Sequence, residues 1–389
     1  MLKNTLTLFG IFFSMVCFGQ TDQLVVAKYI HLPADSLQSK QLIASLNGFL
    51  NQTAKPNNEN VFVLKDDLPE TSALLDEIKG MENGSGPDKK NEYKCYLTNV
   101  MLLDSNNYIV QFSYMGINES TAVLRASFKV IAKKSNSQYY FCSPLKRNTI
   151  SWQVKNVGNA AFYYNAPVDL TRANGYVKKA REFDKKLHAK DYPMHIYFFN
   201  NLNNLLELLG VEYKSDYNGI GYDNSYSFEN NISSYFVGAG TADPAFLDIH
   251  DLWHERLHRV IPVATINRPV DEGCAYLYGG SWGTSWPEIF KQFKAYMGTN
   301  KDWLATYNES KKFSVNRQYP LYTSYVINAL IVQQIEKEKG FGAVIELLSC
   351  GKKEKDNENY FKAIDKITGI SKTNFNQYIQ KLVDNEAVK

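Results

Sequence analysis

The sequence predicts an α+β protein of two domains: an N-terminal domain that combines helices with an antiparallel sheet, and a mostly helical C-terminal domain with a small sheet. Three observations support this prediction. A length of 389 residues, of which 44% are hydrophobic, is enough to bury two cores. From Tyr93 the apolar residues recur with a period of two, which is typical of strands. Beyond residue 165 helical spacing returns, interrupted by short extended segments.

The N-terminal domain is expected over residues 20–165. Apolar side chains at helical spacing predict helices over residues 36–50 and 69–81, and a loop rich in Gly, Ser, Pro and Lys follows over residues 83–91. Five strand-like segments with polar turns between them come next: 93–101, 108–114, 122–131, 138–142 and 150–154. They suggest a curved sheet folded over a helix. No residues in this half have a catalytic spacing, so it is interpreted as an accessory domain that docks a ligand or acts as a spacer.

Residues 1–19 have the composition of a secretory signal peptide. A lysine gives the positive start, residues 6–16 form a short apolar run, and residues 17–19 form a small-x-small cleavage site. The mature chain is then expected to begin at Gln20, and the protein to be exported to the periplasm, the cell surface or the medium. A lipid anchor at Cys17 is the alternative, although the residue before it is a poor one for acylation.

Charge and composition limit the possible partners. The net charge of +3 is close to balanced, and no basic run is interleaved with aromatic residues as in proteins that bind single-stranded nucleic acid. No segment after the leader is long and apolar enough to cross a bilayer. We therefore expect neither a nucleic-acid partner nor a transmembrane segment.

Four cysteines remain once the leader is removed. Export makes disulfides possible, and four cysteines allow three pairings. Sequence position favours Cys95 with Cys142 and Cys274 with Cys350. The chain contains no C-x-x-C spacing, which argues against a zinc site made of cysteines.

The C-terminal domain is expected over residues 166–389. Its first elements are predicted as a charged helix, a strand, a helix and a strand: 169–188, 194–199, 202–209 and 231–237. Asp243 as N-cap and Pro244 at the first position are expected to start the next helix, which Pro262 ends. The strand over residues 231–237 is interpreted either as an edge that binds an extended substrate or as an ordinary edge strand.

That helix contains a His-Glu-x-x-His motif at His254, Glu255 and His258. Two histidines four residues apart project from one face of a helix and can share one zinc ion, and the adjacent glutamate can polarise a water on the metal. His250 lies one turn earlier on the same face, but the end rings of three such histidines are ~12 Å apart along the axis. His250 is therefore interpreted as a pocket wall or a neighbour of the ligands. The alternative for the whole segment is an amphipathic helix with a histidine stripe.

A catalytic zinc needs a third protein ligand and one open position. Residues 259–262 do not contain the glycine and histidine of the metzincin pattern. The next candidate is Glu272, because Pro269 starts a second helix and places Glu272 in its first turn. Asp251 and Asp271 are candidates to accept the outer N–H of the ligating histidines, and each is equally interpretable as a solvated charge.

These residues resemble the gluzincins, particularly the peptidase MA-like family. The match consists of His254-Glu255-x-x-His258 followed by Asp271-Glu272-Gly273-x-Ala275. Further segments look like the C-terminal helices of that family: residues 322–325, 336–340, 345–348 and 361–375. The resemblance covers residues 169–389 and implies a zincin-like C-terminal domain.

The resemblance implies roles for individual residues. His254, His258 and Glu272 would hold zinc, and Glu255 would act as general base on the bound water, whose pKa zinc lowers toward ~7. A tyrosine stabilises the oxyanion in related enzymes, and Tyr325 is the expected donor.

Two features leave alternatives open. Tyr322 is the second candidate for the oxyanion donor, and both tyrosines are also explained by packing in an apolar helix. Arg256 departs from the family pattern, because the residue after the catalytic glutamate is usually apolar. Arg256 and Arg259 are expected to lie away from the ligands, against the front domain or solvent.

Together these inferences predict an exported zinc metallopeptidase that hydrolyses a peptide or protein substrate. One alternative is a catalytically silent gluzincin-like module that binds protein or glycan at the cell envelope. Another is metal-dependent hydrolysis of a different bond, such as an amide in the envelope. The presence of Glu255 argues against the silent module, because a scaffold does not need a carboxylate at that position.

Overall fold

The computed structural model describes residues 24–82, 93–167, 170–215, 219–220, 224–238, 247–314 and 320–386, which form a mixed α/β fold. The predicted signal peptide over residues 1–19 and the predicted loop over residues 83–91 lie outside these ranges. The chain divides into two compact units, each assembled from separate stretches of sequence. The first contains Met1–Leu64, Ile78–Ser143 and Val211–Asn218, and the second contains Lys65–Glu77, Pro144–Gly210 and Gly219–Lys389.

A six-stranded sheet forms the first unit. Its central strands are antiparallel neighbours in sequence order, as the period of two predicts: β2 (Lys94–Leu102), β3 (Asn107–Asn118), β4 (Thr121–Ser135) and β5 (Gln138–Cys142). Two shorter strands complete it, β1 (Leu24–Val26) parallel to β2 and β9 (Val211–Lys214) antiparallel to β4. The strands predicted between residues 93 and 142 are confirmed.

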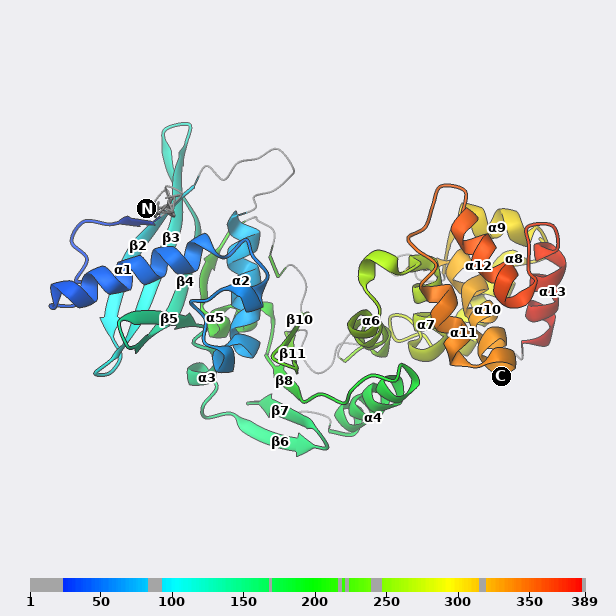
Figure 1. Ribbon diagram of the computed structural model, residues 1–389, viewed down its shortest axis with the longest axis horizontal. Helices are drawn as coiled ribbons and strands as arrows, with labels where there is room; N and C mark the ends of the chain where they lie inside the picture. Colours follow the sequence, from blue (N-terminus) through cyan, green and yellow to red (C-terminus); the bar gives the residue numbers. More distant parts are fainter. Residues whose placement is uncertain are drawn as a thin grey trace, which may run out of the picture. The chain divides into compact units, whose positions relative to one another are not determined.

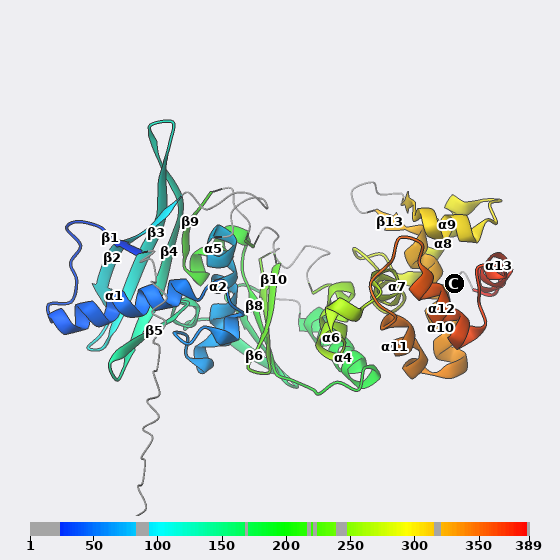
Figure 2. The same ribbon diagram turned by 45° about the horizontal axis from the view of Figure 1, so that its top comes forward.

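The helix α1 (Ser36–Asn51) packs against this sheet, which it crosses in both views (Figure 1, Figure 2). Asp35 caps it, because its carboxylate accepts two backbone N–H groups of the first turn. Apolar residues at helical spacing are completely buried: Leu42, Leu46 and Phe49. The ring of Phe49 lies 5.1 Å from that of Phe141 on β5, centroid to centroid. The predicted helix over residues 36–50 is thus confirmed.

Other helical elements lie between the strands of the first sheet in the sequence. They are η1 (Asn57–Glu59), η2 (Lys65–Asp67), α2 (Leu68–Glu82), α3 (Leu145–Asn148) and α5 (Leu202–Leu209). The predicted helices over residues 69–81 and 202–209 correspond to α2 and α5.

A five-stranded mixed sheet belongs to the second unit. Its order is β10-β11-β8-β7-β6, with bounds β6 (Gln153–Val157), β7 (Ala160–Tyr164), β8 (Met194–Phe198), β10 (Asn224–Glu229) and β11 (Ile232–Val237). β7 and β8 are parallel and are connected through α4 (Leu170–Lys186), as parallel strands require a crossover. Hairpins add β6 beside β7 and β10 beside β11.

This sheet changes two sequence predictions. The strand expected over residues 150–154 was assigned to the front sheet, which is wrong, because β6 pairs with β7 in the second sheet. The predicted domain boundary at residue 165 therefore falls inside the second unit. The strand expected over residues 231–237 is not an edge, because β11 pairs with both β10 and β8. Alternation of apolar and polar residues along one strand does not indicate which other strands it pairs with.

The rest of the second unit is helical (Figure 1, Figure 2). Its helices are α6 (Ile249–Val260), α7 (Arg268–Gly279), α8 (Trp286–Met297), α9 (Trp303–Glu309), α10 (Thr323–Lys339), α11 (Phe341–Leu348), α12 (Glu358–Thr368) and α13 (Phe375–Asn385). A 3-10 turn η3 (Val263–Thr265) joins α6 to α7, and β12 (Lys312–Phe313) pairs with β13 (Leu321–Tyr322). The core cluster joins side chains of β7, β8 and β11 to those of α4 and of all these helices.

The helix α10 lies in the middle of this core. Most of its residues are buried around the whole circumference, so it contacts several helices, and its closest packing is against α7. Gly273 permits this packing, since a Cβ at that position would lie 2.6 Å from the Cβ of Asn328 on α10. The packing fixes the position of α7 and hence of the acidic residues in its first turns.

The four cysteines within the described residues are free, so the predicted pairs Cys95–Cys142 and Cys274–Cys350 are wrong. Cys95 lies on β2 and Cys142 on β5, with β3 and β4 between them in the sheet. Three strand spacings amount to ~14 Å, which is too far for a disulfide. No helix in the described part of the chain is long and apolar enough to span a membrane.

Candidate metal centre

The histidines lie on α6, which is shorter than expected. It begins at Ile249, and Asp248 caps it by accepting the backbone N–H of His250 at 2.9 Å. The prediction that Asp243 caps this helix is wrong, since the helix starts later; Asp243 and Pro244 lie outside the described residues. Its end at Val260, before the predicted proline, agrees with the sequence.

A second helix, α7, supplies carboxylates that face α6. Pro269 stands at its start, as predicted, and Asp271 and Glu272 follow in its first turns. The two helices pack side by side. At the other end of α7, a Cβ on Gly279 would lie 2.7 Å from the backbone nitrogen of His250, so this approach requires glycine.

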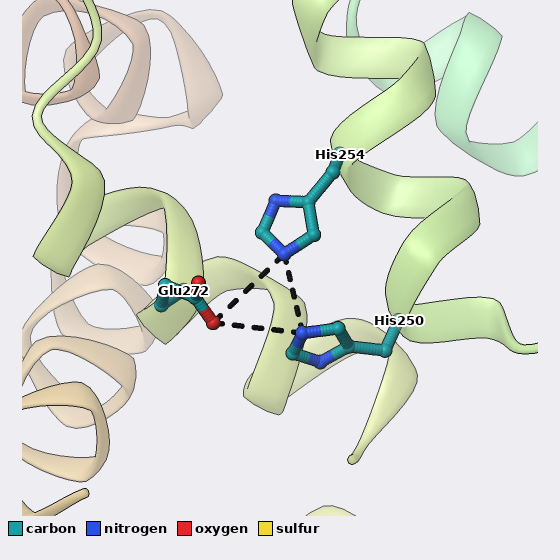
Figure 3. A group of neighbouring side chains, drawn as sticks. All are labelled: His250, His254 and Glu272. Carbon is teal, nitrogen blue, oxygen red and sulfur yellow. Dashed lines mark hydrogen bonds and ion pairs between the residues drawn. The ribbon is translucent and has the colours of Figure 1, made fainter. Parts of the chain in front are cut away.

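Three side chains from the two helices converge on one point (Figure 3). The Nε2 atoms of His250 and His254 are 3.2 Å apart. The Oε2 atom of Glu272 lies 3.5 Å from His250 Nε2 and 3.9 Å from His254 Nε2. The side chains are 13%, 20% and 13% exposed for His250, His254 and Glu272, so the group is accessible from solvent. Two imidazoles and a carboxylate are a donor set that zinc uses.

The outer nitrogens of both rings are held by hydrogen bonds. His250 Nδ1 lies 2.8 Å from the carbonyl oxygen of Gly280, and His254 Nδ1 lies 2.9 Å from Asp271 Oδ1. The prediction that Asp271 accepts the outer N–H of a histidine agrees with this contact. Asp251 is exposed, and among the described contacts it has no hydrogen bond to a histidine.

His258 is placed differently from the other two histidines. Its Nε2 atom lies 3.3 Å from Asp271 Oδ2, and its side chain is 37% exposed. It forms a second possible metal group with His254 and Asp271. Within the described residues, the expected set of His254, His258 and Glu272 does not appear as one compact group: the structure brings His254 together with Glu272 and places His258 beside Asp271.

Electrostatics favour a cation at this centre. Burial opposes ionisation of Asp271, but hydrogen bonds from His254 and His258 lower its pKa well below the usual value. Burial likewise opposes ionisation of Glu272, while its contact with His250 lowers the pKa of the carboxyl. Burial disfavours the charged form of His250, yet the same contact raises its pKa. Two ionised carboxylates beside the rings therefore favour a positive charge between them.

Glu255 faces a different set of partners. Its carboxylate accepts a hydrogen bond from the hydroxyl of Tyr235 and forms an ion pair with Arg259. It also lies 3.7 Å from Nε of Arg256. The side chain is only 6% exposed, so the predicted general base belongs to a buried charge cluster.

Arg256 is completely buried, which corrects the expectation that it faces solvent or the front domain. Its Nε atom lies 3.7 Å from Asp184 on α4, and its Nη2 donates to the sulfur of Met194 at 2.8 Å. The departure from the family pattern thus has a structural explanation, because Arg256 offsets the charges of Glu255 and Asp184 inside the second unit. The side chain of Arg259 is only 7% exposed, and it donates to the hydroxyl of Tyr226 at 3.1 Å.

Tyr325, the expected oxyanion donor, lies close to the acidic side of the centre. It stands in the first turn of α10, and its ring is 5.6 Å from that of Tyr276, which in turn lies 5.9 Å from the ring of His250. Burial, followed by the charge of Glu272, raises the pKa of Tyr325 to about 12, so its hydroxyl keeps its proton at neutral pH. Tyr322 precedes α10 as its N-cap residue.

A cavity of about 530 Å³ lies along α6. Its wall is largely aromatic, with residues from α4, β10 and β11: Tyr176, Tyr226, Phe228 and Tyr235. Asp251, Glu255 and His258 of α6 also line it. β10 is the edge strand of the sheet, so an edge does reach the cavity, although it is not the strand that was expected. This aromatic wall was missed in the sequence because its residues are scattered.

A comparison with known protein families finds none that matches the sequence. A comparison with curated proteins finds no match either. The resemblance to the gluzincins therefore rests on the motif and the C-terminal segments of this sequence and stays a prediction.

Proposed function

We propose that the protein is an exported zinc-dependent peptidase that hydrolyses peptide bonds through a metal-activated water. The observation that carries the proposal is the convergence of imidazole nitrogens from α6 and the Glu272 carboxylate from α7 on one solvent-accessible point. When bound, zinc supplies a Lewis acid and a water of lowered pKa. Export rests on the predicted signal peptide.

The residues present fit zinc. The two bonded Nδ1 atoms leave the lone pairs of His250 Nε2 and His254 Nε2 free to face Glu272. Asp271 holds His254 in this orientation, an arrangement common around zinc. Tyr325, in the first turn of α10, is close enough to Glu272 for that charge to raise its pKa, and its hydroxyl stays protonated and able to donate to a developing oxyanion.

A second candidate is the catalytically silent module that binds protein or glycan. The ion pair between Glu255 and Arg259 favours it, because a carboxylate engaged by a guanidinium is a weaker base. The aromatic cavity also favours it, since its volume of about 530 Å³ suits a bound side chain or sugar.

Zinc content and cleavage separate the two candidates. The mature chain from residue 20 is stripped with a chelator, titrated with zinc by calorimetry, and incubated with denatured casein and a peptide library. We expect one zinc per chain and cleavage that returns when zinc is restored. The double variant His254→Ala/Glu272→Ala should lose both, whereas His31→Ala, which removes an exposed histidine elsewhere, should lose neither.

Each outcome decides between the candidates. Failure of the wild-type chain to bind zinc refutes the peptidase. Zinc binding without cleavage of any peptide favours the silent module. Cleavage of a non-peptide amide alone favours the other alternative from the sequence, metal-dependent hydrolysis of an amide in the envelope.

A further inference from the structure

We propose that the metal ligands are His250, His254 and Glu272, one helical turn earlier than the His-Glu-x-x-His motif indicates. This inference rests on the proposed zinc site and replaces the ligand set of His254, His258 and Glu272 that the motif predicts. His258, the second histidine of the motif, then lies outside the coordination sphere.

The distances agree with a single tetrahedral ion. Zinc binds histidine nitrogen and carboxylate oxygen at ~2.0–2.2 Å, so two ligand atoms of a tetrahedron are ~3.3 Å apart. The three separations in the group of His250, His254 and Glu272 are 3.2, 3.5 and 3.9 Å. Small rotations of the side chains are therefore enough to close the site around an ion.

The hydrogen bonds select the same nitrogen on both rings. A proton on Nδ1 of His250 is bound by the Gly280 carbonyl, and a proton on Nδ1 of His254 is bound by Asp271. In that tautomer the lone pair of each ring is on Nε2, the atom that faces Glu272. Both rings are thus oriented as metal ligands usually are, with the outer nitrogen bonded to an oxygen.

The alternative group of His254, His258 and Asp271 lacks this arrangement. It would use Nδ1 of His254, the atom that already donates to Asp271. Asp271 also accepts the indole N–H of Trp253 at 3.0 Å. Since His258 Nε2 adds a third contact at 3.3 Å, this buried carboxylate is surrounded by nitrogen donors. Such a carboxylate orients its neighbours and has little free capacity to bind a metal.

The backbone keeps His250 in its place. Gly280 has φ of +79°, which a residue with a side chain rarely adopts, and it presents its carbonyl to the ring of His250. Gly279 lets α7 approach the first turn of α6, because a Cβ there would lie 2.7 Å from the backbone nitrogen of His250. The contact on His250 is therefore built into the junction of the two helices.

The assignment shifts the position of the carboxylate that follows the first ligand. In the earlier register, His250 is followed by Asp251 and the segment becomes His-Asp-x-x-His. Glu255 is then free to serve as the counter-charge of Arg256 and Arg259, which its contacts indicate. Asp251 is exposed and lines the cavity.

Zinc affinity of single variants tests the assignment directly. The mature chain and the variants His250→Ala, His254→Ala, His258→Ala and Glu272→Ala are titrated with zinc in competition with a chromophoric chelator. We expect losses of more than about 100-fold for His250, His254 and Glu272, since removal of an outer partner alone costs ~10–100-fold. His258→Ala should stay within about 3-fold of His31→Ala, which removes a histidine far from the site in sequence.

The reverse pattern overturns the inference. If His258→Ala loses as much affinity as His254→Ala and His250→Ala does not, the motif register is correct and the proposed zinc site survives. If the wild-type chain binds no zinc, the proposed function itself fails.

A spectral control guards against misfolding. His250→Asp should still bind cobalt(II), but the visible absorption of the bound cobalt should differ from that in the wild type. His258→Asp should leave this spectrum as in the wild type. An unchanged spectrum for His250→Asp would contradict the assignment.

Discussion

Two faces of α6 contain charged clusters of different construction. On one face His250 and His254 are partly exposed and direct their Nε2 atoms toward Glu272. On another, Glu255 and Arg256 are buried and balance one another together with Asp184 and Arg259. The histidine cluster is arranged to bind a cation, whereas the buried cluster already contains the cationic side chains of Arg256 and Arg259. A motif of five residues therefore spans two sites with different purposes.

The largest effect on activity should come from replacing the carboxylate that follows a histidine of α6 by its amide. Asp251 follows His250, and Glu255 follows His254. In the earlier register Asp251 follows the first ligand, the position that a general base has in the motif, so Asp251→Asn is expected to lower the rate of peptide hydrolysis by ~10²–10⁴-fold without loss of zinc. Glu255→Gln should keep the rate per folded molecule within about threefold and lower stability instead. Initial rates and zinc content of both variants measure this. If Glu255→Gln loses the rate and Asp251→Asn keeps it, the comparison is reversed.

Removal of a buried guanidinium tests the second face. Arg256→Leu leaves Glu255 and Asp184 without their common partner, and we expect a loss of about 3–5 kcal/mol in the free energy of unfolding. Urea denaturation followed by circular dichroism measures it, with Arg268→Leu as control, since that arginine is 79% exposed. A loss below ~1 kcal/mol would mean that the cluster is not a structural counter-charge.

Removal of the expected oxyanion donor, Tyr325, should have a smaller effect on catalysis. Tyr325→Phe removes only the hydroxyl and should lower kcat by ~10²–10³-fold, with zinc affinity unchanged. Tyr322→Phe is the matched control and should keep kcat within about threefold. Equal effects of the two substitutions would argue for packing rather than for a donor role.

The hydrogen bond between Asp271 and His254 should contribute less to zinc affinity than the ligands themselves. Asp271→Asn removes the charge that orients His254 and is expected to weaken zinc binding by ~10–100-fold. Competition with a chelator measures the affinity. No change would show that His254 keeps its orientation without this carboxylate.

The smallest effect concerns the start of α6. Asp248→Ala removes a cap and should cost ~1 kcal/mol of stability, while Asp248→Asn, which can still accept the His250 N–H, should cost a few tenths. Thermal unfolding of the two variants gives the difference. Equal losses would indicate that the charge, and not the cap, matters at this position.

Sequence reasoning found the elements but not all of their neighbours. The period of two located β2 to β5, and helical spacing located α1, α2 and α5, because each pattern is local. The partners of β6, β9 and β11 depend on segments far along the chain, which no local pattern encodes. The same applies to Arg256, whose burial follows from the approach of Asp184 on α4.

The site shows the same limit. His254 and Glu272 were found because the motif and the second helix indicate them. The choice between His250 and His258 was not decidable from spacing, since each lies four residues from His254. The separation of ~12 Å between the rings of His250 and His258 along the helix axis excludes a site of all three histidines, but not one made by His250 and His254. What separates the two pairs is the position of Glu272, which α10 sets through its contact at Gly273.

The contact between Gly279 and the backbone of His250 has a consequence for variation of this protein. At this junction main chain meets main chain, so the spacing of α6 and α7 there does not depend on the size of any side chain. Core substitutions elsewhere can then change how tightly the helices pack while the Gly280 carbonyl keeps its hydrogen bond to His250. The geometry of the metal centre should therefore tolerate drift in the surrounding core far better than any enlargement at this one glycine.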